Sequence, residues 1–448
     1  MAPDQPLKAR YVILGNSAGA VGAIEALRAL DHEGAILAIS EEAYAPYSRP
    51  LIADFLAGTR TLTQILYRAS DFYVKKGVVP VLDARVEKVD FEARQVWMAD
   101  RSRFPQPIGF EKLLLAVGGA PFVPPMEGSD KKNIFTFTSL KDAVTIKTRV
   151  GDINKVLVIG GGLIGICVTE ALVKLGKRVI IVELLDRVLN MNLDKASSEI
   201  YRKRLEGRGV TLITKDSVVK FLGRSSDDTK VGGALLKSGD KIDCDMVIVA
   251  IGVRPRLDLV KGTAVKINKG ITVDRHMETS VPGVYACGDV AEAYDFVWDQ
   301  NRLSPIWPNA YLGGRIAGNN MAGKVSEYPG STGMTSFTYF DLPVVSAGMN
   351  MLPSEEVGRA GDVTDQECAR YEVLMKSAKD NFYRKVIIKD GLIKGVIMIK
   401  DVTGAGILTD LMRDRVEVSK FREALMSEEL GIAHLPQEML PARLRGEH

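Results

Sequence analysis

The chain has 448 residues, of which 46% are hydrophobic and 26% are charged; this is the composition of a globular protein with two or three domains and argues against long disorder. Its 59 basic and 56 acidic side chains give a formal net charge of +3, which does not indicate a nucleic-acid-binding surface. Four scattered cysteines without a Cys-x-x-Cys pair argue against a disulfide framework, a zinc site or a redox dithiol, and indicate reduced thiols in the cytoplasm.

Two apolar segments, residues 11–24 and 156–169, imitate a signal peptide and a membrane span. Both are interrupted by glycines, and the second is shorter than the roughly 20 apolar residues that a spanning helix needs. We therefore interpret both as buried parallel strands that turn into helices, and expect no membrane span.

The predicted elements begin with a β-α-β unit: a strand at 11–14, a glycine turn, a helix to about residue 29 and a strand at 35–39. The same order returns with a strand at 155–159, a glycine turn, a helix to about residue 175 and a strand at 178–182. Two dinucleotide-type units in one chain are far more informative than one.

The other elements are shorter. Between the two units, residues 80–115 read as short strands ending in an apolar strand at 112–116, and another strand at 245–250 closes the second unit. Residues 271–290 are predicted to form a strand pair leading to Gly288 and Asp289. Beyond about residue 325 we predict a strand at 336–340, a hairpin of 385–388 with 392–398, helices at 404–414 and 418–428, and a tail from 436 that is poorly ordered or docks on a partner.

The second glycine turn, residues 160–165 with the sequence Gly-Gly-Gly-Leu-Ile-Gly, is an unbroken G-x-G-x-x-G between strand and helix. Gly160 permits a tight turn, Gly162 lets the backbone approach a pyrophosphate, and Gly165 lets helix and strand pack closely. Free N–H groups at the helix N-terminus attract the phosphates. The turn predicts an NAD site formed by Gly160, Gly162, Leu163, Ile164 and Gly165.

Glu183 ends the strand that follows this turn, where a carboxylate can accept hydrogen bonds from both ribose hydroxyls. The same carboxylate would repel a 2′-phosphate, so the sequence favours NADH over NADPH. Arg187 is close enough in the chain to soften that preference.

The first glycine turn, residues 15–20 with the sequence Gly-Asn-Ser-Ala-Gly-Ala, is degenerate. Ala20 is an allowed variant of the third glycine, and Ser17 is small enough to stand at the second, where its hydroxyl can donate to a phosphate. After the next strand, spacing favours Glu41 as the ribose ligand, in a register open by one residue.

Six segments across nearly the whole chain form a pattern: residues 15–20, 47–51 (Tyr-Ser-Arg-Pro-Leu), 115–118 (Leu-Ala-Val-Gly), 160–165, 250–255 (Ala-Ile-Gly-Val-Arg-Pro) and 284–289 (Val-Tyr-Ala-Cys-Gly-Asp). The pattern resembles the FAD- and NAD(P)-dependent pyridine nucleotide oxidoreductases, most of all the branch with rubredoxin and ferredoxin reductases, the flavin part of NADH-nitrite reductase and NADH oxidases. The resemblance implies an α/β fold with two Rossmann-type dinucleotide-binding domains and a C-terminal α+β domain.

This resemblance implies a role for each matching position. Asp289 would bind the FAD ribitol, Arg49 and Pro50 would line the flavin, and Val86 would hold the adenine through its backbone. Ala116 and Gly118 would lie at the domain crossover. Asn309 and Ala310 would begin a helix, 310–322, whose N-terminus points at the flavin, and Asn309 could equally cap that helix.

The residues assigned to FAD are Gly15, Ser17, Ala18, Ala20, Glu41, Arg49, Pro50, Val86, Ala116, Gly118, Gly288, Asp289, Asn309 and Ala310, and Gly252 is added to the NAD residues. No catalytic acid or base is assigned, and Arg49 is the candidate for tuning the flavin. The domains implied are 1–118 and 251–325 for FAD, 119–250 for NAD, and 326–448 as a C-terminal interface domain.

Two departures from the family pattern concern cysteine. Disulfide reductases of the family carry one or two cysteines on the first helix after the FAD strand, but alignment on Gly58 places Pro50 there, and no cysteine precedes Cys167. Cys167 itself replaces a glutamate that the family often has near the nicotinamide; it is a small packed residue, or a modulator of that site.

Without a thiol at the flavin, electrons must leave the flavin directly. The leading hypothesis is electron transfer from NADH through FAD to an iron–sulfur or rubredoxin-type protein. The acceptor would be a separate protein because the chain has no cysteine cluster of its own. We expect the chain to act as a homodimer or as a subunit of a complex. The alternatives are an NADH oxidase that uses oxygen and a signalling flavoprotein whose redox state governs association.

Overall fold

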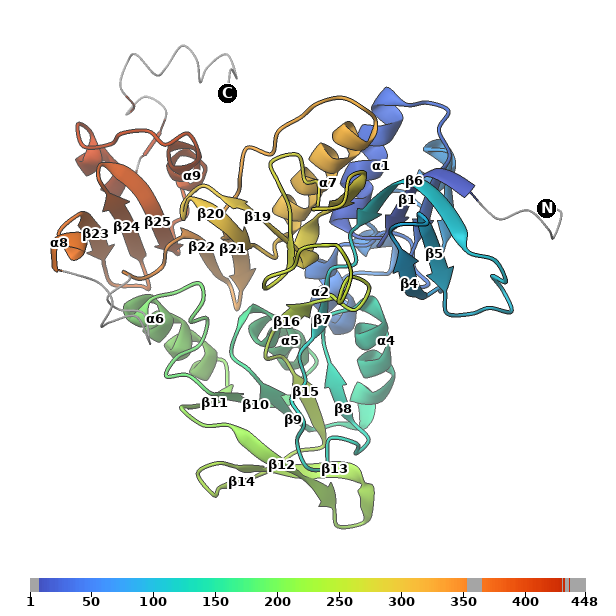
Figure 1. Cartoon of the computed structure of the whole chain (residues 1–448). Coiled ribbons are helices and arrows are strands. Elements are labelled where there is room, and N and C mark those ends of the chain that lie inside the picture. The colour runs from blue at the N-terminus through green and yellow to red at the C-terminus, as the bar shows by residue number, and fades with distance from the viewer. Residues whose placement is uncertain (1–7, 353–364, 429, 432–434, 436–448) are drawn as a thin grey trace. The chain divides into compact units, whose positions relative to one another are not determined.

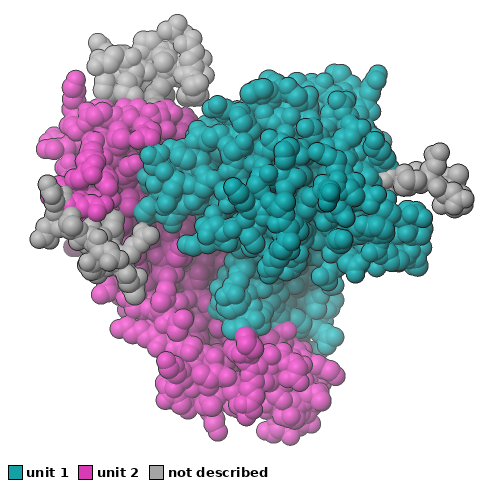
Figure 2. Space-filling view, viewed as in Figure 1, with its two compact units in different colours: residues 1–124, 135–152, 251–331 teal, residues 125–134, 153–250, 332–448 magenta. Residues whose placement is uncertain are grey.

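The computed structural model of the chain describes residues 8–352, 365–428, 430–431 and 435. The chain divides into two compact units, each built from several stretches (Figure 2). Unit 1 comprises residues 1–124, 135–152 and 251–331, and unit 2 comprises residues 125–134, 153–250 and 332–448. This division groups residues 135–152 with the first glycine turn and the C-terminal part with the second.

Unit 1 contains a seven-stranded sheet with the order β3-β2-β1-β6-β5-β4, in which β18 also pairs with β6 (Figure 1). Its strands are β1 (Lys8–Leu14), β2 (Ile36–Ile39), β3 (Val78–Val81), β4 (Val86–Asp90), β5 (Gln95–Met98), β6 (Ile108–Leu115) and β18 (Val284–Ala286). β1 runs parallel to β2 and β6, and its four last residues are buried, as expected for strands covered on both faces.

The remaining elements of unit 1 surround this sheet. The helices are α1 (Ala18–Leu30), α2 (Ile52–Ala57), α3 (Phe72–Lys75), α4 (Leu140–Arg149) and α7 (Trp307–Met321), with short 3-10 turns η1 (Arg49–Leu51), η2 (Thr63–Ile65), η3 (Val150–Asp152) and η4 (Gly288–Val290). Two small sheets pair β7 (Gly119–Pro121) with β16 (Val253–Pro255), and β19 (Ala291–Asp295) with β17 (Ile271–Thr272) and β20 (Gln300–Leu303).

Helices α1 and α7 lie side by side (Figure 1) and approach until their backbones touch. A Cβ added at Gly314 would lie 2.0 Å from the carbonyl oxygen of Gly19, and one added at Gly22 would lie 2.3 Å from that of Tyr311. Only glycine permits these approaches, so glycines on both helices set how closely α7 packs on the helix that follows the first turn.

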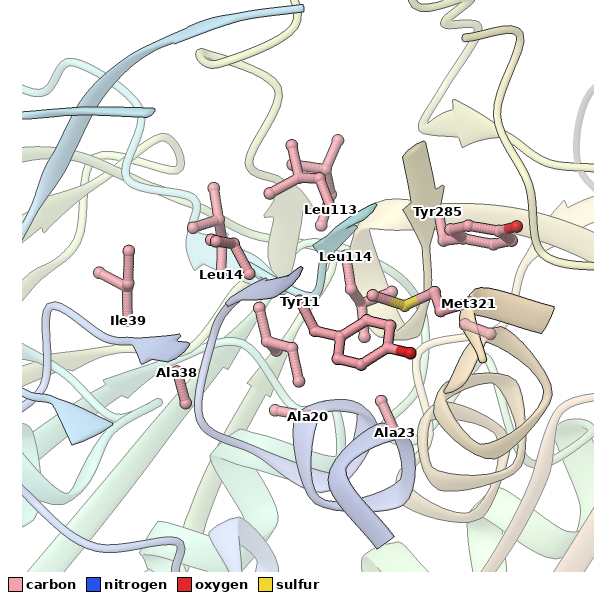
Figure 3. Packing of buried hydrophobic residues seen from close by; sticks show 14 of the residues in the cluster. Tyr11, Leu14, Ala20, Ala23, Ala38, Ile39, Leu113, Leu114, Tyr285 and Met321 are labelled. Atoms are coloured by element: carbon pink, nitrogen blue, oxygen red, sulfur yellow. The ribbon is translucent and has the colours of Figure 1, made fainter. Parts of the chain in front are cut away.

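The core of unit 1 joins the sheet to both of these helices (Figure 3). Buried side chains converge from β1, β2, β6, β18, α1 and α7; those labelled in the figure are Tyr11, Leu14, Ala20, Ala23, Ala38, Ile39, Leu113, Leu114, Tyr285 and Met321. Burial of this apolar surface, worth roughly 25 cal/mol per Å², fixes the strand ends from which the first turn projects.

A second sheet has the order β11-β10-β9-β15-β8; β11, β10, β9 and β15 run parallel within unit 2, and of β8 only Ile134 belongs to that unit. Its strands are β8 (Ile134–Thr136), β9 (Lys155–Ile159), β10 (Arg178–Glu183), β11 (Thr211–Thr214) and β15 (Met246–Val249), and its helices are α5 (Leu163–Lys174) and α6 (Lys195–Glu206). An antiparallel sheet is formed by β12 (Val218–Arg224), β13 (Asp227–Leu236) and β14 (Lys241–Asp243).

The C-terminal part of unit 2 is an antiparallel sheet with the order β21-β22-β25-β24-β23. Its strands are β21 (Met334–Tyr339), β22 (Leu342–Gly348), β23 (Tyr371–Ser377), β24 (Tyr383–Lys389) and β25 (Leu392–Ile399), and α8 (Asp365–Cys368), α9 (Ala405–Arg413) and the 3-10 turn η6 (Arg422–Met426) accompany them. The pairing of β24 with β25 confirms the predicted hairpin.

A buried cluster ties this sheet to α6 within unit 2. One oxygen of Asp194 accepts from the backbone N–H of Ser197 at 3.0 Å and so caps α6. The other oxygen accepts from Lys385 Nζ at 2.8 Å and from the Tyr383 hydroxyl at 2.6 Å. The Lys385 and Asp194 side chains are only 7% and 11% exposed, so this ion pair lies inside the unit.

The predicted fold class is confirmed: both β-α-β units and the C-terminal α+β part are present. The predicted strand pair within 271–290 is wrong, because the fully buried β18 joins β6 in the large sheet while β17 pairs with β19. The predicted helix at 418–428 is reduced to η6, since the N–H of Val418 bonds to the carbonyl of Gly391 at 2.9 Å instead of starting a helix.

The tail that was expected to be loose or docked on a partner, from residue 436, lies outside the described residues. Within the described part of the chain, no helix is both long and apolar enough to cross a membrane.

Candidate functional site

The first glycine turn connects β1 to α1 against the end of β6. Gly15 has φ +125°, and a Cβ there would lie 2.1 Å from the carbonyl oxygen of Ala116, so only glycine fits. The N–H of Gly15 bonds to the carbonyl of Ile39 at 2.8 Å, and that of Ala116 to the carbonyl of Leu14 at 2.8 Å. The predicted residues Gly15 and Ala116 are therefore brought together.

Ser17 is the N-cap of α1, and its side chain makes no capping hydrogen bond. The first bond within the helix runs from the N–H of Val21 to the carbonyl of Ser17 at 3.0 Å, so the N–H groups of Ala18 and Ala20 have no acceptor inside the helix. Such a helix end suits the phosphates of a dinucleotide.

The register of the paired strands shows which residue after β2 occupies the position that Glu183 has after the second turn. Ile39 pairs with Leu14, and Val182 pairs with Ile159, so Ser40 corresponds to Glu183. Glu41 stands one residue beyond, and its carboxylate pairs with Arg256 at 2.6 Å. The carbonyl of Ser40 also accepts from the N–H of Ala84 at 2.9 Å, which places the start of the strand with Val86 close to this end of β2.

The N-terminus of α7 lies beside the first turn. The helix begins at Trp307 with Ile306 as its N-cap, so the predicted start at 310 and the assignment of Asn309 as cap are wrong. Pro308, at the second position, fits the first turn because it needs no N–H acceptor. Ala310 nevertheless faces the site: a Cβ at Gly288 would lie 3.5 Å from its Cβ.

Arg49 and Asp289 come together in unit 1 although they are far apart in the sequence. Burial raises the pKa of Asp289, and the positive charge of Arg49 opposes that rise. Burial alone would lower the pKa of Arg49, but Tyr47, Glu42 and Asp289 raise it above its ordinary value. Pro50, next to Arg49, is exposed at the start of η1.

Gly118 and Gly252 directly precede the paired strands β7 and β16. The N–H of Arg256 bonds to the carbonyl of Gly118 at 3.0 Å, and that of Phe122 to the carbonyl of Gly252 at 3.0 Å. A Cβ on either glycine would meet no atom within 4 Å. Gly252 belongs to unit 1, whereas the other residues assigned to NAD belong to unit 2.

The second glycine turn connects β9 to α5 in unit 2. Its first glycine makes the same kind of hydrogen bond as Gly15 in the first turn: the N–H of Gly160 bonds to the carbonyl of Val182, in the neighbouring strand, at 2.8 Å. A Cβ on Gly165 would lie 1.9 Å from the carbonyl oxygen of Gly160, whereas one on Gly162, the N-cap of α5, would meet nothing within 4 Å. The N–H groups of Leu163 and Ile164 precede the first bond within the helix, from Ile166 to Gly162.

Glu183 closes this turn from the end of β10. One carboxylate oxygen accepts from the N–H of Gly161 at 2.6 Å, and the other accepts from that of Leu185 at 2.8 Å. Each oxygen has two lone pairs, so both keep acceptor capacity for ribose hydroxyls. The open position at Gly162 and this carboxylate fit a dinucleotide, as the open helix end of α1 does in unit 1.

None of the four cysteines forms a disulfide. Cys287 is buried beside the α1–α7 contact, and burial, together with the charge of Asp289, raises the pKa of its thiol to about 12. Cys167, on α5, is buried next to Tyr339 of β21. No group of three or more metal-ligating side chains is found among the residues that the structure describes.

Sequence reasoning missed the side chains that hold Arg49. Glu42 and Tyr47 lie in the same loop as Arg49 and contact it directly. Their proximity in sequence, an acid and a tyrosine within seven residues of the arginine, was the available clue.

Comparison with known proteins agrees with this geometry. Residues 9–314 match the family described as pyridine nucleotide-disulphide oxidoreductase. The epsilon subunit of NADH-dependent phenylglyoxylate dehydrogenase from Aromatoleum evansii is 28% identical over 426 residues, which cover 94% of this chain and 96% of that one. Rubredoxin-NAD(+) reductase from Pseudomonas putida is 30% identical over 320 residues, 71% of this chain and 81% of that one.

Solved structures share the fold. Putidaredoxin reductase, in its covalent complex with putidaredoxin, superposes with a TM-score of 0.82 at 22% identity, over 98% of this chain and 99% of that one. The water-forming NADH oxidase of Lactobacillus brevis gives 0.83 at 20% identity, over 94% and 93%. With the family match over residues 9–314, the chain belongs to the pyridine nucleotide-disulphide oxidoreductases, a family that depends on FAD and NAD(H), and is an NAD(P)H-dependent flavin oxidoreductase.

Proposed function

We propose that the chain binds FAD in unit 1 and NADH in unit 2, takes hydride from NADH and passes the electrons to an iron–sulfur or rubredoxin-type protein. The observation that carries the proposal is the repeated turn. Gly15 and Gly160 each donate an N–H to the end of the neighbouring strand at 2.8 Å, and each turn leads into the open N-terminus of a helix. Two such turns accommodate two dinucleotides.

Bound FAD supplies a hydride acceptor that can release its electrons one at a time. The residues of unit 1 would hold and orient it. The N-terminus of α1 attracts the pyrophosphate, the carboxylate of Asp289 suits the ribitol hydroxyls, and the charged Arg49 lies beside Asp289. The N-terminus of α7, with Asn309 and Ala310 in its first turn, offers positive potential to the reduced ring.

The preference for NADH rests on Glu183. With NADPH in the proposed site, this buried carboxylate would face the 2′-phosphate, and like charges repel strongly at short range. Arg187, which would offset this repulsion, already pairs with Asp186 at 2.8 Å and donates to the sulfur of Met351 at 2.9 Å.

The acceptor is inferred from what surrounds the flavin site. No cysteine occurs before Cys167, and Pro50 stands where the disulfide branch carries its thiol, so direct exit of electrons to a partner is favoured. The resemblance to rubredoxin-NAD(+) reductase and to a dehydrogenase subunit supports a redox-protein partner and assembly as a homodimer or within a complex. The four cysteines, none of them in a disulfide, suit a cytoplasmic setting.

A second candidate is an NADH oxidase. The NADH oxidase of Methanocaldococcus jannaschii is 29% identical over 408 residues, covering 86% of each chain. In that case oxygen replaces the protein acceptor at the same flavin.

The test is a pair of measurements on the FAD-loaded protein. Anaerobic mixing with NADH should bleach the flavin absorbance, and bleaching by neither NADH nor NADPH would overturn the proposal. Steady-state NADH consumption is then compared in air alone and anaerobically with a purified rubredoxin or [2Fe–2S] ferredoxin. Faster turnover with the protein acceptor is expected; fast turnover in air alone favours the oxidase. An anaerobic pull-down with mass spectrometry identifies the natural partner.

A further inference from the structure

Arg49 is held by a network of side chains that the proposed function does not use. Glu42 accepts from Arg49 Nη2 through Oε1 and from the Tyr47 hydroxyl, at 2.6 Å, through Oε2. The Arg49 guanidinium also lies over the Tyr47 ring, 5.4 Å from its centroid. A single carboxylate therefore fixes both neighbours at once.

The same network reaches the N-terminus of α4. Arg49 Nη1 donates to the carbonyl of Thr138 at 2.8 Å, and the Tyr47 hydroxyl accepts from the N–H of Leu140 at 2.9 Å. Ser139 and Asp142 cap this helix reciprocally, which makes its first turn a firm anchor. The arginine is thus restrained from two sides, by a carboxylate and by a helix start.

One part of the guanidinium stays open. The Arg49 side chain is 40% exposed and that of Glu42 is 20% exposed. The two hydrogen bonds to Glu42 and Thr138 occupy two of the five N–H donors of an arginine. The charge of Arg49 is also felt by Asp289, since each shifts the pKa of the other.

We propose that Glu42 is a positioning residue for the flavin: it holds Arg49 beside the ring and, by its own negative charge, offsets the positive field that Arg49 exerts there. This inference rests on the proposed function, because it assumes that FAD occupies unit 1. A positive charge near the ring stabilises the reduced, anionic flavin, so an unbalanced Arg49 favours reduction. The negative charge of Glu42 weakens this preference for the reduced flavin.

The test measures the flavin midpoint potential of FAD-loaded variants by anaerobic dye-coupled titration. Glu42→Gln keeps the shape of the side chain and removes its charge. We expect it to favour reduced over oxidised flavin about tenfold more than wild type, a rise of about 30 mV for a two-electron couple. Arg49→Gln should shift the potential by a similar amount in the opposite direction.

A double variant removes both charges and remains informative if Glu42→Gln alone does not fold. The potential of Glu42→Gln/Arg49→Gln should lie above that of Arg49→Gln and close to wild type. If the double variant instead matches or lies below Arg49→Gln, Glu42 does not oppose Arg49 and the inference is wrong.

Asp31 provides a matched control, because its carboxylate also bridges an arginine and a tyrosine: it accepts from Arg10 Nη1 at 2.7 Å and from the Tyr11 hydroxyl at 2.8 Å. It follows the C-terminal end of α1, away from the glycine turn. Asp31→Asn should leave the potential unchanged, and equal shifts in Asp31→Asn and Glu42→Gln would overturn the inference. A wild-type protein that fails to hold FAD or to be reduced contradicts the proposed function instead.

Discussion

Glu183 performs two tasks at the end of β10. It accepts the backbone N–H of Gly161 in the second glycine turn and that of Leu185 after β10, and in the proposed function it also receives the ribose of NADH. The place of this carboxylate at the end of a strand was predictable because an apolar strand and an intact glycine motif fix the register. At the first turn the motif is degenerate, and three polar residues follow the strand, so only the paired strands show that Ser40 corresponds to Glu183.

Glu183→Gln should lose the charge and one of the two backbone hydrogen bonds, because a glutamine side chain has a single acceptor oxygen. Loss of a charge-assisted hydrogen bond costs about 1.5–3 kcal/mol, so we expect the Kd for NADH to rise about tenfold or more while that for NADPH changes less. Equilibrium titration with both nucleotides measures the ratio. Glu199→Gln, on the exposed face of α6, serves as the control; a ratio of affinities that stays at the wild-type value in Glu183→Gln would refute the ribose assignment.

Gly162 and Gly165 make a matched pair in the same turn. Ala at 162 meets no atom within 4 Å and stands at an ordinary φ of −79°, so the fold should keep its Tm. Its methyl group projects where the pyrophosphate is proposed to lie, and NADH affinity should fall at least tenfold. Ala at 165 would meet the Gly160 carbonyl at 1.9 Å and should lower the Tm itself. Calorimetry and NADH titration separate the two effects; equal binding by Gly162→Ala and wild type would count against the site.

At the scale of elements, local pattern was enough where a strand runs directly into a glycine turn. The predicted strand at 155–159 matches β9, and the predicted hairpin matches β24 and β25. The sequence pattern did not predict strand pairing between segments that lie far apart in the chain. β18 has three buried residues, and only its parallel pairing with β6 makes it part of the main sheet. The contact between α1 and α7 was equally hidden, because the two helices lie far apart in the sequence.

The α1–α7 contact leads to a test of packing. Gly314→Ala would force a methyl group to 2.0 Å from the Gly19 carbonyl, so the helices must separate. We expect a loss of about 1–3 kcal/mol in the free energy of unfolding and weaker retention of FAD, since α1 carries the first turn. Gly406→Ala, in α9, meets no atom within 4 Å and should be neutral or stabilising. Chemical denaturation of both variants provides the comparison, and equal stabilities would contradict the close contact.

At the scale of the whole molecule, the buried pair of Asp194 and Lys385 joins two parts of unit 2 that sequence analysis placed in separate domains. Burial by itself would raise the pKa of Asp194, but hydrogen bonds from Lys385, Ser197 and Tyr383 lower it below the ordinary value. A folded-state pKa below the unfolded one means that this carboxylate adds stability above about pH 4 and loses it as the pH falls further.

Lys385→Met should leave the Asp194 charge buried without its cation. We expect a loss of about 3–5 kcal/mol at neutral pH, and a smaller difference from wild type at pH 4, where the buried carboxylate of the variant, which has lost its cation, can take up a proton and shed its uncompensated charge. The comparison is Lys376→Met, which removes an exposed lysine paired with Glu428 and should change little. Unfolding curves at pH 7 and pH 4 decide; the prediction fails if the two variants lose the same stability at pH 7.

The family resemblance implied that the chain returns to the first domain at residue 251, but the grouping of residues 135–152 with unit 1 and of the C-terminal part with unit 2 depends on contacts between residues far apart in the sequence. It also determines when the protein can be finished during synthesis. The sheet of unit 1 lacks β18 until residues 284–286 have left the ribosome, and unit 2 still awaits the residues beyond 331 at that point. Neither unit is therefore complete before most of the chain has been synthesised, and a chain cut short within residues 251–331 would lack part of both units.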